Sequence, residues 1–253
     1  MNGVSHQDVF GADPWLTIGD RSFTSRLLLG VEQYTNPQII GQVLRAASAD
    51  VFITTYDLDN TRSSLLLSDV DGEIDLSRYT WIGTTSFARS PEAAVETAVQ
   101  LRDKLDLDII KLDVRSSDNL PDAEGTILAA KQLIGGGFTI LPLVLPDVTT
   151  VLALQELGCV AVRLMGSPVG AHRGLADPTA VKDCIDALTI PSVVEGGIGS
   201  PAHVVQAMEL GADAVLVNTM IAKAEQPAVM AQAVYQGLLA GGLAARARNG
   251  GTH

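Results

Sequence analysis

The stretch Ile109-Ile110-Lys111-Leu112-Asp113-Val114 decides the fold that we expect for this chain. It is apolar except for two charges, which is typical of a short strand in a covered sheet. Side chains alternate across a strand, so Lys111 and Asp113 share one face, and apolar side chains occupy the other. If the charged face is the inside of a barrel, the core contains an amine and a carboxylate.

Two interpretations of this strand follow. Charged side chains are rarely buried unless they are paired or have a role, and a desolvated lysine becomes a nucleophile toward carbonyl groups. In the other interpretation, Lys111 and Asp113 form an ion pair on an exposed face. The strand by itself does not decide between them.

The rest of the chain repeats the pattern of a short apolar run followed by a helix. We expect the other strands at residues 26–30, 51–55, 81–85, 139–144, 161–165, 192–195 and 214–218. Helix starts are indicated by the pairs Asn36-Pro37, Ser90-Pro91, Asp177-Pro178 and Ser200-Pro201. Residues 56–77 form a polar connection without an obvious full helix.

Eight nearly apolar strands that mostly alternate with helices predict one α/β domain, a (β/α)8 TIM barrel, over residues 15–243. A doubly wound open sheet is the alternative, but Gly30-Val31-Glu32-Gln33 lacks the glycine pattern of a dinucleotide site. We expect residues 1–14 and 244–253 to be flexible tails. The formal charge of −12 argues against a nucleic-acid partner.

The two cysteines show no metal or redox spacing, so we expect reduced core residues in a cytoplasmic protein. No stretch is apolar enough to predict a membrane span or a signal peptide.

In such barrels the active site lies at the carboxyl ends of the strands. Those ends carry Lys111, Asp113 and Glu195. Glu195 precedes Gly196-Gly197 and a helix start, where backbone N–H groups favour an anion. We therefore expect a phosphate there, with Gly170, Asn218 and Thr219 completing its site; ordinary turn glycines are the alternative.

The sequence does not decide the roles of three further basic residues. Arg163 faces inward as a counter-ion to Glu195 or Asp113, or else lies at the rim. His172 and Arg173 either contact the ligand or are solvated. The whole set fits imine formation between Lys111 and a sugar phosphate, with the two carboxylates moving protons. An aldolase and a sugar-phosphate isomerase use the same groups.

The sequence resembles the thiazole synthase family from about Leu16 to Arg246. The motifs are Ser25-Arg26-Leu27-Leu28-Leu29-Gly30, Ile110-Lys111-Leu112-Asp113-Val114, Gly166-Ser167-Pro168-Val169-Gly170, Gly197-Ile198-Gly199-Ser200-Pro201, and the segment from Ala207 to Thr219. The resemblance implies an oligomeric barrel without metal or organic cofactor. Its lysine, matched by Lys111, forms an imine with a deoxyketose phosphate, and a ubiquitin-like sulfur carrier protein supplies a C-terminal thiocarboxylate.

This chain departs from the family pattern at four places. It has Asp113 where the family has Glu, and Glu195 where the family has Asp. Thr54-Thr55-Tyr56-Asp57 stands where paired arginines are usual, and Gly83-Thr84-Thr85-Ser86-Phe87 replaces a Pro-Asn-Thr-Ala-Gly motif. These changes resemble the 2-thiosugar synthases of bacterial secondary metabolism, which implies glucose 6-phosphate as the substrate. The second hypothesis is a thiazole synthase that uses 1-deoxy-D-xylulose 5-phosphate, and the third is an aldolase or isomerase. The alternative that is not an enzyme is a non-catalytic sugar-phosphate sensor.

Overall fold

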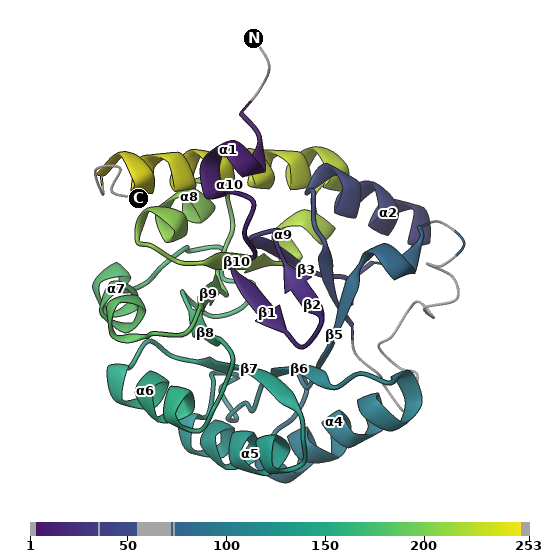
Figure 1. Cartoon of the computed structure of the whole chain (residues 1–253), viewed down its shortest axis with the longest axis vertical. Helices are drawn as coiled ribbons and strands as arrows, with labels where there is room; N and C mark the ends of the chain where they lie inside the picture. Colours follow the sequence, from purple (N-terminus) through teal and green to yellow (C-terminus); the bar gives the residue numbers. More distant parts are fainter. Residues whose placement is uncertain (1–3, 35, 55–71, 73, 249–253) are drawn as a thin grey trace.

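The structure, a computed structural model, describes residues 4–34, 36–54, 72 and 74–248. The barrel strands are β3 (Leu27–Gly30), β4 (Val51–Thr54), β5 (Thr80–Thr84), β6 (Ile109–Leu112), β7 (Thr139–Val144), β8 (Val162–Met165), β9 (Ser192–Glu195) and β10 (Ala214–Val217). They close into a barrel in the order β10-β3-β4-β5-β6-β7-β8-β9 (Figure 1). Every neighbouring pair is parallel, so the predicted (β/α)8 barrel is confirmed.

Helices cover the outside of the barrel (Figure 1). They are α2 (Pro37–Ala46), α4 (Pro91–Leu105), α5 (Ala123–Gly135), α6 (Val148–Glu156), α7 (Pro178–Ala187), α8 (Pro201–Glu209), the short α9 (Thr219–Ala222) and α10 (Pro227–Arg248). The side chains of Asn36, Ser90 and Asp177 cap their helices as predicted. Ser200 occupies the N-cap position of α8, but its side chain makes no capping hydrogen bond.

The alternation predicted for β6 is confirmed. Ile110, Leu112 and Val114 belong to the outer core between sheet and helices, whereas Ile109 belongs to a separate cluster inside the barrel. Lys111 therefore points inward, above the layer that contains Ile109. A short antiparallel hairpin, β1 (Leu16–Ile18) and β2 (Arg21–Phe23), adds to that inner cluster, which closes the end of the barrel opposite the carboxyl ends of the strands.

The strand β6 ends at Leu112, two residues earlier than predicted. The reason is a side chain on the neighbouring segment: the Thr85 hydroxyl accepts a hydrogen bond from the Asp113 N–H and donates one to the Asp113 carbonyl, both at 2.8 Å. This contact replaces the sheet ladder at Asp113. The carboxylate therefore lies just beyond the strand, where its position is fixed by side chains.

The described parts of the two expected tails contain helices. α1 (His6–Phe10) begins with a capping box formed by Ser5 and Asp8. α10 continues to Arg248, and the Arg246 guanidinium donates to the carbonyls of Asp8, at 2.5 Å, and Val9, at 3.1 Å. Figure 1 shows α1 against α10. Each of these helices thus packs on the other, and the flexibility expected for the two tails stays a prediction.

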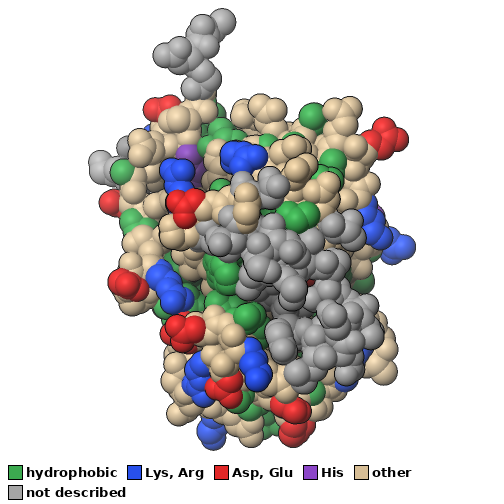
Figure 2. All heavy atoms as spheres, turned by 90° about the vertical axis from the view of Figure 1, so that its right-hand side faces the viewer, with side chains coloured by type: hydrophobic (Ala, Val, Ile, Leu, Met, Phe, Trp, Pro, Cys, Tyr) green, Lys and Arg blue, Asp and Glu red, His purple; other side chains and the backbone are tan. Residues whose placement is uncertain are grey.

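The helix α10 is the one described helix that is long and apolar enough to cross a membrane by length and composition, so the expectation that no stretch is apolar enough is wrong by these two criteria. Its contacts with α8 and α2 account for that composition, because a helix that covers a barrel needs an apolar face. The molecular face in Figure 2 mixes acidic and basic side chains over its described surface. The departure predicted at Thr55-Tyr56-Asp57, and most of the 56–77 connection, lie outside the described residues.

Candidate active site

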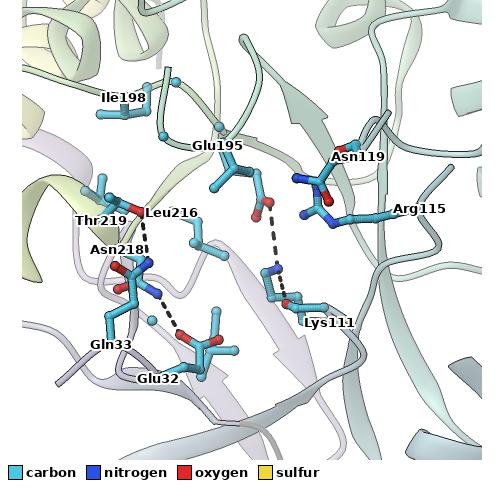
Figure 3. A pocket seen from close by; sticks show the side chains of 18 of the residues that line it. Glu32, Gln33, Lys111, Arg115, Asn119, Glu195, Ile198, Leu216, Asn218 and Thr219 are labelled. Carbon is cyan, nitrogen blue, oxygen red and sulfur yellow. Dashed lines mark hydrogen bonds and ion pairs between the residues drawn. The ribbon is translucent and has the colours of Figure 1, made fainter. Parts of the chain in front are cut away.

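A cavity of about 400 Å³ opens at the carboxyl ends of the strands. Its walls include Lys111 and Glu195, together with the predicted phosphate-site residues Gly170, Gly196, Gly197, Asn218 and Thr219. These residues are spread over more than 100 positions of the chain, and the closed barrel brings them to one mouth. Their shared location supports the prediction that they form one site, as Figure 3 shows for those labelled there.

Lys111 lies at one side of the cavity and is only 6% exposed. Its Nζ is 3.1 Å from Asp113 Oδ1 and 3.8 Å from Glu195 Oε1. It also donates to the Ser86 hydroxyl at 3.4 Å. The exposed-face interpretation of this lysine is therefore wrong: the amine is inside the barrel between two carboxylates, with one side reaching the cavity.

Asp113 is a counter-ion in this arrangement. Its Oδ1 accepts from Lys111 and from Arg163 at 2.5 Å, and its Oδ2 accepts from Arg115 at 2.6 Å. Burial opposes ionisation of this carboxyl, but Lys111, Arg163 and Arg115 outweigh burial and hold its pKa well below the usual range. The group is 1% exposed and does not line the cavity. A carboxylate held by three cations is a poor proton carrier.

Arg163 connects this cluster to the neighbouring strands. Its Nε donates to the Leu141 carbonyl at 2.8 Å and its Nη2 to the Leu112 carbonyl at 2.7 Å. Its Nη1 binds Glu195 Oε2 at 2.7 Å. Burial alone would lower its pKa, but the Glu195 and Asp113 carboxylates outweigh burial and raise it. The predicted inward counter-ion is thus found, and it serves both carboxylates rather than one.

Arg163 is consequently not a substrate contact. It has 0% exposure and lies behind Glu195 instead of in the cavity wall. His172 does line the cavity, but Arg173 is exposed outside it, so the solvated interpretation holds for Arg173. Of the three basic residues whose roles the sequence left undecided, only His172 therefore lines the cavity.

The glycine loops bring backbone close to the cavity. Gly170, Gly196 and Gly197 have φ angles of +80°, +76° and +68°, a region that favours glycine. A Cβ on Gly197 would lie 1.7 Å from the Ser167 hydroxyl oxygen. That oxygen is buried and makes no hydrogen bond within the described part of the chain. Glycine at position 197 thus allows the loop to pack closely against Ser167, and the backbone at all three positions borders the cavity without a side chain.

The opposite side of the cavity contains a carboxylate that the sequence did not single out. Glu32 Oε2 accepts a hydrogen bond from Asn218 Nδ2 at 2.7 Å, and Gln33 Nε2 donates to the Thr219 hydroxyl at 2.9 Å (Figure 3). Burial raises the pKa of Glu32; Lys111 opposes this rise, while Asp113 and Glu195 add to it. The only feature of the sequence that could have indicated Glu32 is a single acidic residue two positions after the barrel strand β3.

Other lining residues were also missed. Arg115 follows Asp113 by two residues, so strand alternation could have placed it with Lys111. Ser86, Arg89 and Asn119 come from the loops after β5 and β6, and these loops carry no pattern that distinguishes a wall residue from a solvated one. Within the described residues, no group of three or more His, Cys, Asp or Glu side chains could hold a metal ion.

The comparisons with known proteins agree with this geometry. The family model described as "Thiazole biosynthesis protein ThiG" matches residues 17–252. The thiazole synthase of Photobacterium profundum is 34% identical over 94% of this chain and 93% of its own length. That of Exiguobacterium sibiricum is 37% identical, covering 90% of each.

Among solved structures, BexX from the Amycolatopsis orientalis BexX/CysO complex superposes with a TM-score of 0.90. It is 52% identical and the match covers 96% of this chain and 98% of that one. A 3-hexulose-6-phosphate synthase, with a TM-score of 0.57 and 14% identity, shares the fold alone.

Proposed function

This chain belongs to the thiazole biosynthesis family, and we propose that it is a sulfur-transferring synthase that holds its sugar-phosphate substrate as an imine on Lys111. The observation that carries the proposal is the position of the lysine. Its amine is buried beside Glu195 and opens onto a cavity that the glycine-rich loops also line. An amine, a nearby carboxylate and an anion-binding loop are the parts that imine chemistry on a phosphorylated sugar needs.

The first step follows from the contacts of Lys111. Glu195 Oε1 lies 3.8 Å from the amine and takes its proton. The free amine then attacks the substrate carbonyl, and the proton that the attacking nitrogen loses moves to the carbonyl oxygen. Glu195 returns its own proton to the resulting hydroxyl, which leaves as water. Asp113 stays ionised throughout and provides a fixed negative charge beside the resulting iminium.

We propose glucose 6-phosphate as the substrate, with sulfur added at carbon two after the carbonyl has moved there. Two observations favour it over 1-deoxy-D-xylulose 5-phosphate. The chain is 52% identical to BexX but only 34% and 37% identical to the two thiazole synthases above. It also carries Asp113 and Glu195 where the resemblance implies the opposite acids.

The sulfur donor in this proposal is the C-terminal thiocarboxylate of a small ubiquitin-like carrier protein. The crystallised complex of BexX with CysO supports a protein partner at this fold. We further propose that the enzyme works in the cytoplasm as a homo-oligomer, without a metal or organic cofactor.

Trapping the imine tests the proposal. The protein is incubated with glucose 6-phosphate or with 1-deoxy-D-xylulose 5-phosphate, reduced with borohydride and weighed by mass spectrometry. We expect an adduct with the hexose in the wild type and in Lys182→Ala, whose lysine is on the exposed face of α7, but none in Lys111→Ala. An adduct with neither sugar, or one that survives Lys111→Ala, rules out the imine.

The same experiment separates the alternatives. An adduct only with the pentose indicates a thiazole synthase. An adduct with the hexose but no sulfur product, when an active thiocarboxylated carrier is supplied, indicates an aldolase or isomerase. Binding of the sugar without any adduct indicates a non-catalytic barrel.

A further inference from the structure

We infer that Glu32 is a further catalytic residue, the group that moves the substrate proton from carbon two to carbon one once the imine has formed. This inference rests on the proposed function. A carbonyl group can move along the sugar only if a base removes a proton from carbon. The two acids that the sequence predicted for this step, Asp113 and Glu195, are both engaged in other contacts.

Asp113 is the less suitable of the two. Its oxygens accept from Lys111, Arg163 and Arg115, and the carboxylate does not face the cavity. Glu195 faces the cavity, but its Oε2 is bound to Arg163 and its Oε1 lies next to the lysine amine. Glu195 is therefore placed to serve the nitrogen, and the substrate carbons extend away from it into the cavity.

Glu32 lies on the other side of that cavity, as Figure 3 shows. No ion pair between described residues includes Glu32; its carboxylate is held by the neutral Asn218 amide. A neutral donor fixes the position of a carboxyl group without fixing its charge. Asn218 can donate to Glu32 whether or not the carboxyl carries a proton, which is what a group that both takes and gives protons requires.

The fold makes room for this arrangement at the end of β3. A Cβ on Gly30 would lie 2.5 Å from Asn218 Nδ2 and 2.6 Å from Glu32 Oε2. The missing side chain at Gly30 thus creates the space in which the carboxyl and the amide meet. Burial is the main cause that raises the pKa of Glu32, and a raised pKa makes its carboxylate a stronger base than an exposed glutamate.

The proton transfer balances without a further reactant. The Glu32 carboxylate removes the proton from carbon two of the iminium. The electron pair of that C–H bond forms a double bond between carbons one and two, and the C=N pair returns to the Lys111 nitrogen. The Glu32 carboxyl then donates its proton to carbon one, and the hydroxyl at carbon two releases its proton to water to become the ketone.

The test locates the label that borodeuteride leaves on the Lys111 adduct. Reduction before the proton transfer puts deuterium on carbon one, and reduction after it puts deuterium on carbon two. Fragmentation of the adduct peptide in a mass spectrometer distinguishes the two. With glucose 6-phosphate, we expect carbon two to be labelled in the wild type and carbon one in Glu32→Gln, with the transfer slowed by roughly 10²–10⁴-fold.

Two variants complete the design. Glu32→Asp keeps an acid and should label carbon two at an intermediate rate. Glu156→Gln removes an exposed carboxylate from α6 and should behave as the wild type. Carbon-two labelling of Glu32→Gln at the wild-type rate, or loss of its adduct altogether, overturns the assignment. Absence of any adduct in the wild type instead refutes the proposed function, so the two failures are distinguishable.

Discussion

The two sides of the cavity hold their carboxylates in different ways. On the side of β6, β8 and β9, Asp113 and Glu195 are bound by Lys111, Arg115 and Arg163. On the side of β10 and β3, Glu32 is bound by an amide. Cations stabilise the ionised form of an acid, whereas an amide stabilises its position. Asp113, which three cations hold, is therefore built to keep its charge, and Glu32 to change it.

The largest effect is expected from removing a counter-ion on the side of β6, β8 and β9, which we call the cationic side; the side of β10 and β3 is the neutral side. Asp113→Asn leaves Arg163 and Arg115 short of a counter-ion inside the barrel, and removing one partner of a buried ion pair costs about 3–5 kcal/mol. We expect the free energy of unfolding in urea to fall by that amount. The matched control is Asp186→Asn, which breaks the exposed Lys182–Asp186 pair and should cost less than about 1 kcal/mol. Equal losses in the two variants would contradict the distinction drawn between the sides.

A smaller effect is expected from crowding the neutral side. Gly30→Ala places a Cβ against the Asn218 amide and the Glu32 carboxyl, so both side chains must move. Overpacking of this kind costs about 1–3 kcal/mol, and the displaced acid should also slow labelling of carbon two. Gly135→Ala in α5, where a Cβ meets nothing within 4 Å, is the control. Normal labelling in Gly30→Ala would show that the position of Glu32 does not matter.

The charge of Glu32 should affect stability in a pH-dependent way. A pKa that is raised on folding adds stability below the unfolded pKa of the glutamate, and this stability is lost as pH rises through the folded pKa. Glu32→Gln stays neutral and avoids the loss. Its thermal midpoint should therefore exceed that of the wild type at pH 8, and the difference should vanish in acid. A lower midpoint at pH 8 would mean that the carboxylate stabilises the fold.

The smallest effect is expected at the edge of the neutral side. Thr219→Val removes the hydroxyl that accepts from Gln33, a hydrogen bond of 2.9 Å at the partly exposed start of α9. Water replaces this bond, so the free energy of unfolding should change by less than about 1 kcal/mol. Binding of inorganic phosphate, followed by calorimetry, should weaken if Thr219 contacts the phosphate. Unchanged binding would remove Thr219 from that site.

Periodicity and composition predicted the barrel because the strands consist mostly of apolar residues. The bounds of β7 and β9 agree with the sequence, since both strands are flanked by clear turn residues. The predicted end of β6 was wrong because the Thr85 hydroxyl, remote in sequence, forms hydrogen bonds with the N–H and the carbonyl of Asp113. Short elements such as α1 and the β1–β2 hairpin carry too few residues for a periodic signal.

The site was predicted as a set of residues but not as a set of roles. Lys111 and Glu195 could be placed because strand ends of a barrel meet at one mouth. The role of Asp113 depends on Arg163, and alternation could place that arginine inside without showing which carboxylate it binds. In the sequence, Glu32 is a single charged residue in a turn, which does not indicate a role. Its contact with Asn218 joins residues at opposite ends of the chain, which no local pattern reveals.

The buried guanidinium of Arg163 has a consequence for how such enzymes diversify. It ties β8 to backbone groups of β6 and β7 and to a carboxylate of β9, so a substitution within this group of strands disturbs several contacts together. The loop after β3 lies outside that network. Mutations there, at positions other than Glu32, leave the contacts of the nucleophile in place. New substrates can therefore evolve on one wall of the barrel without cost to the chemistry on the other.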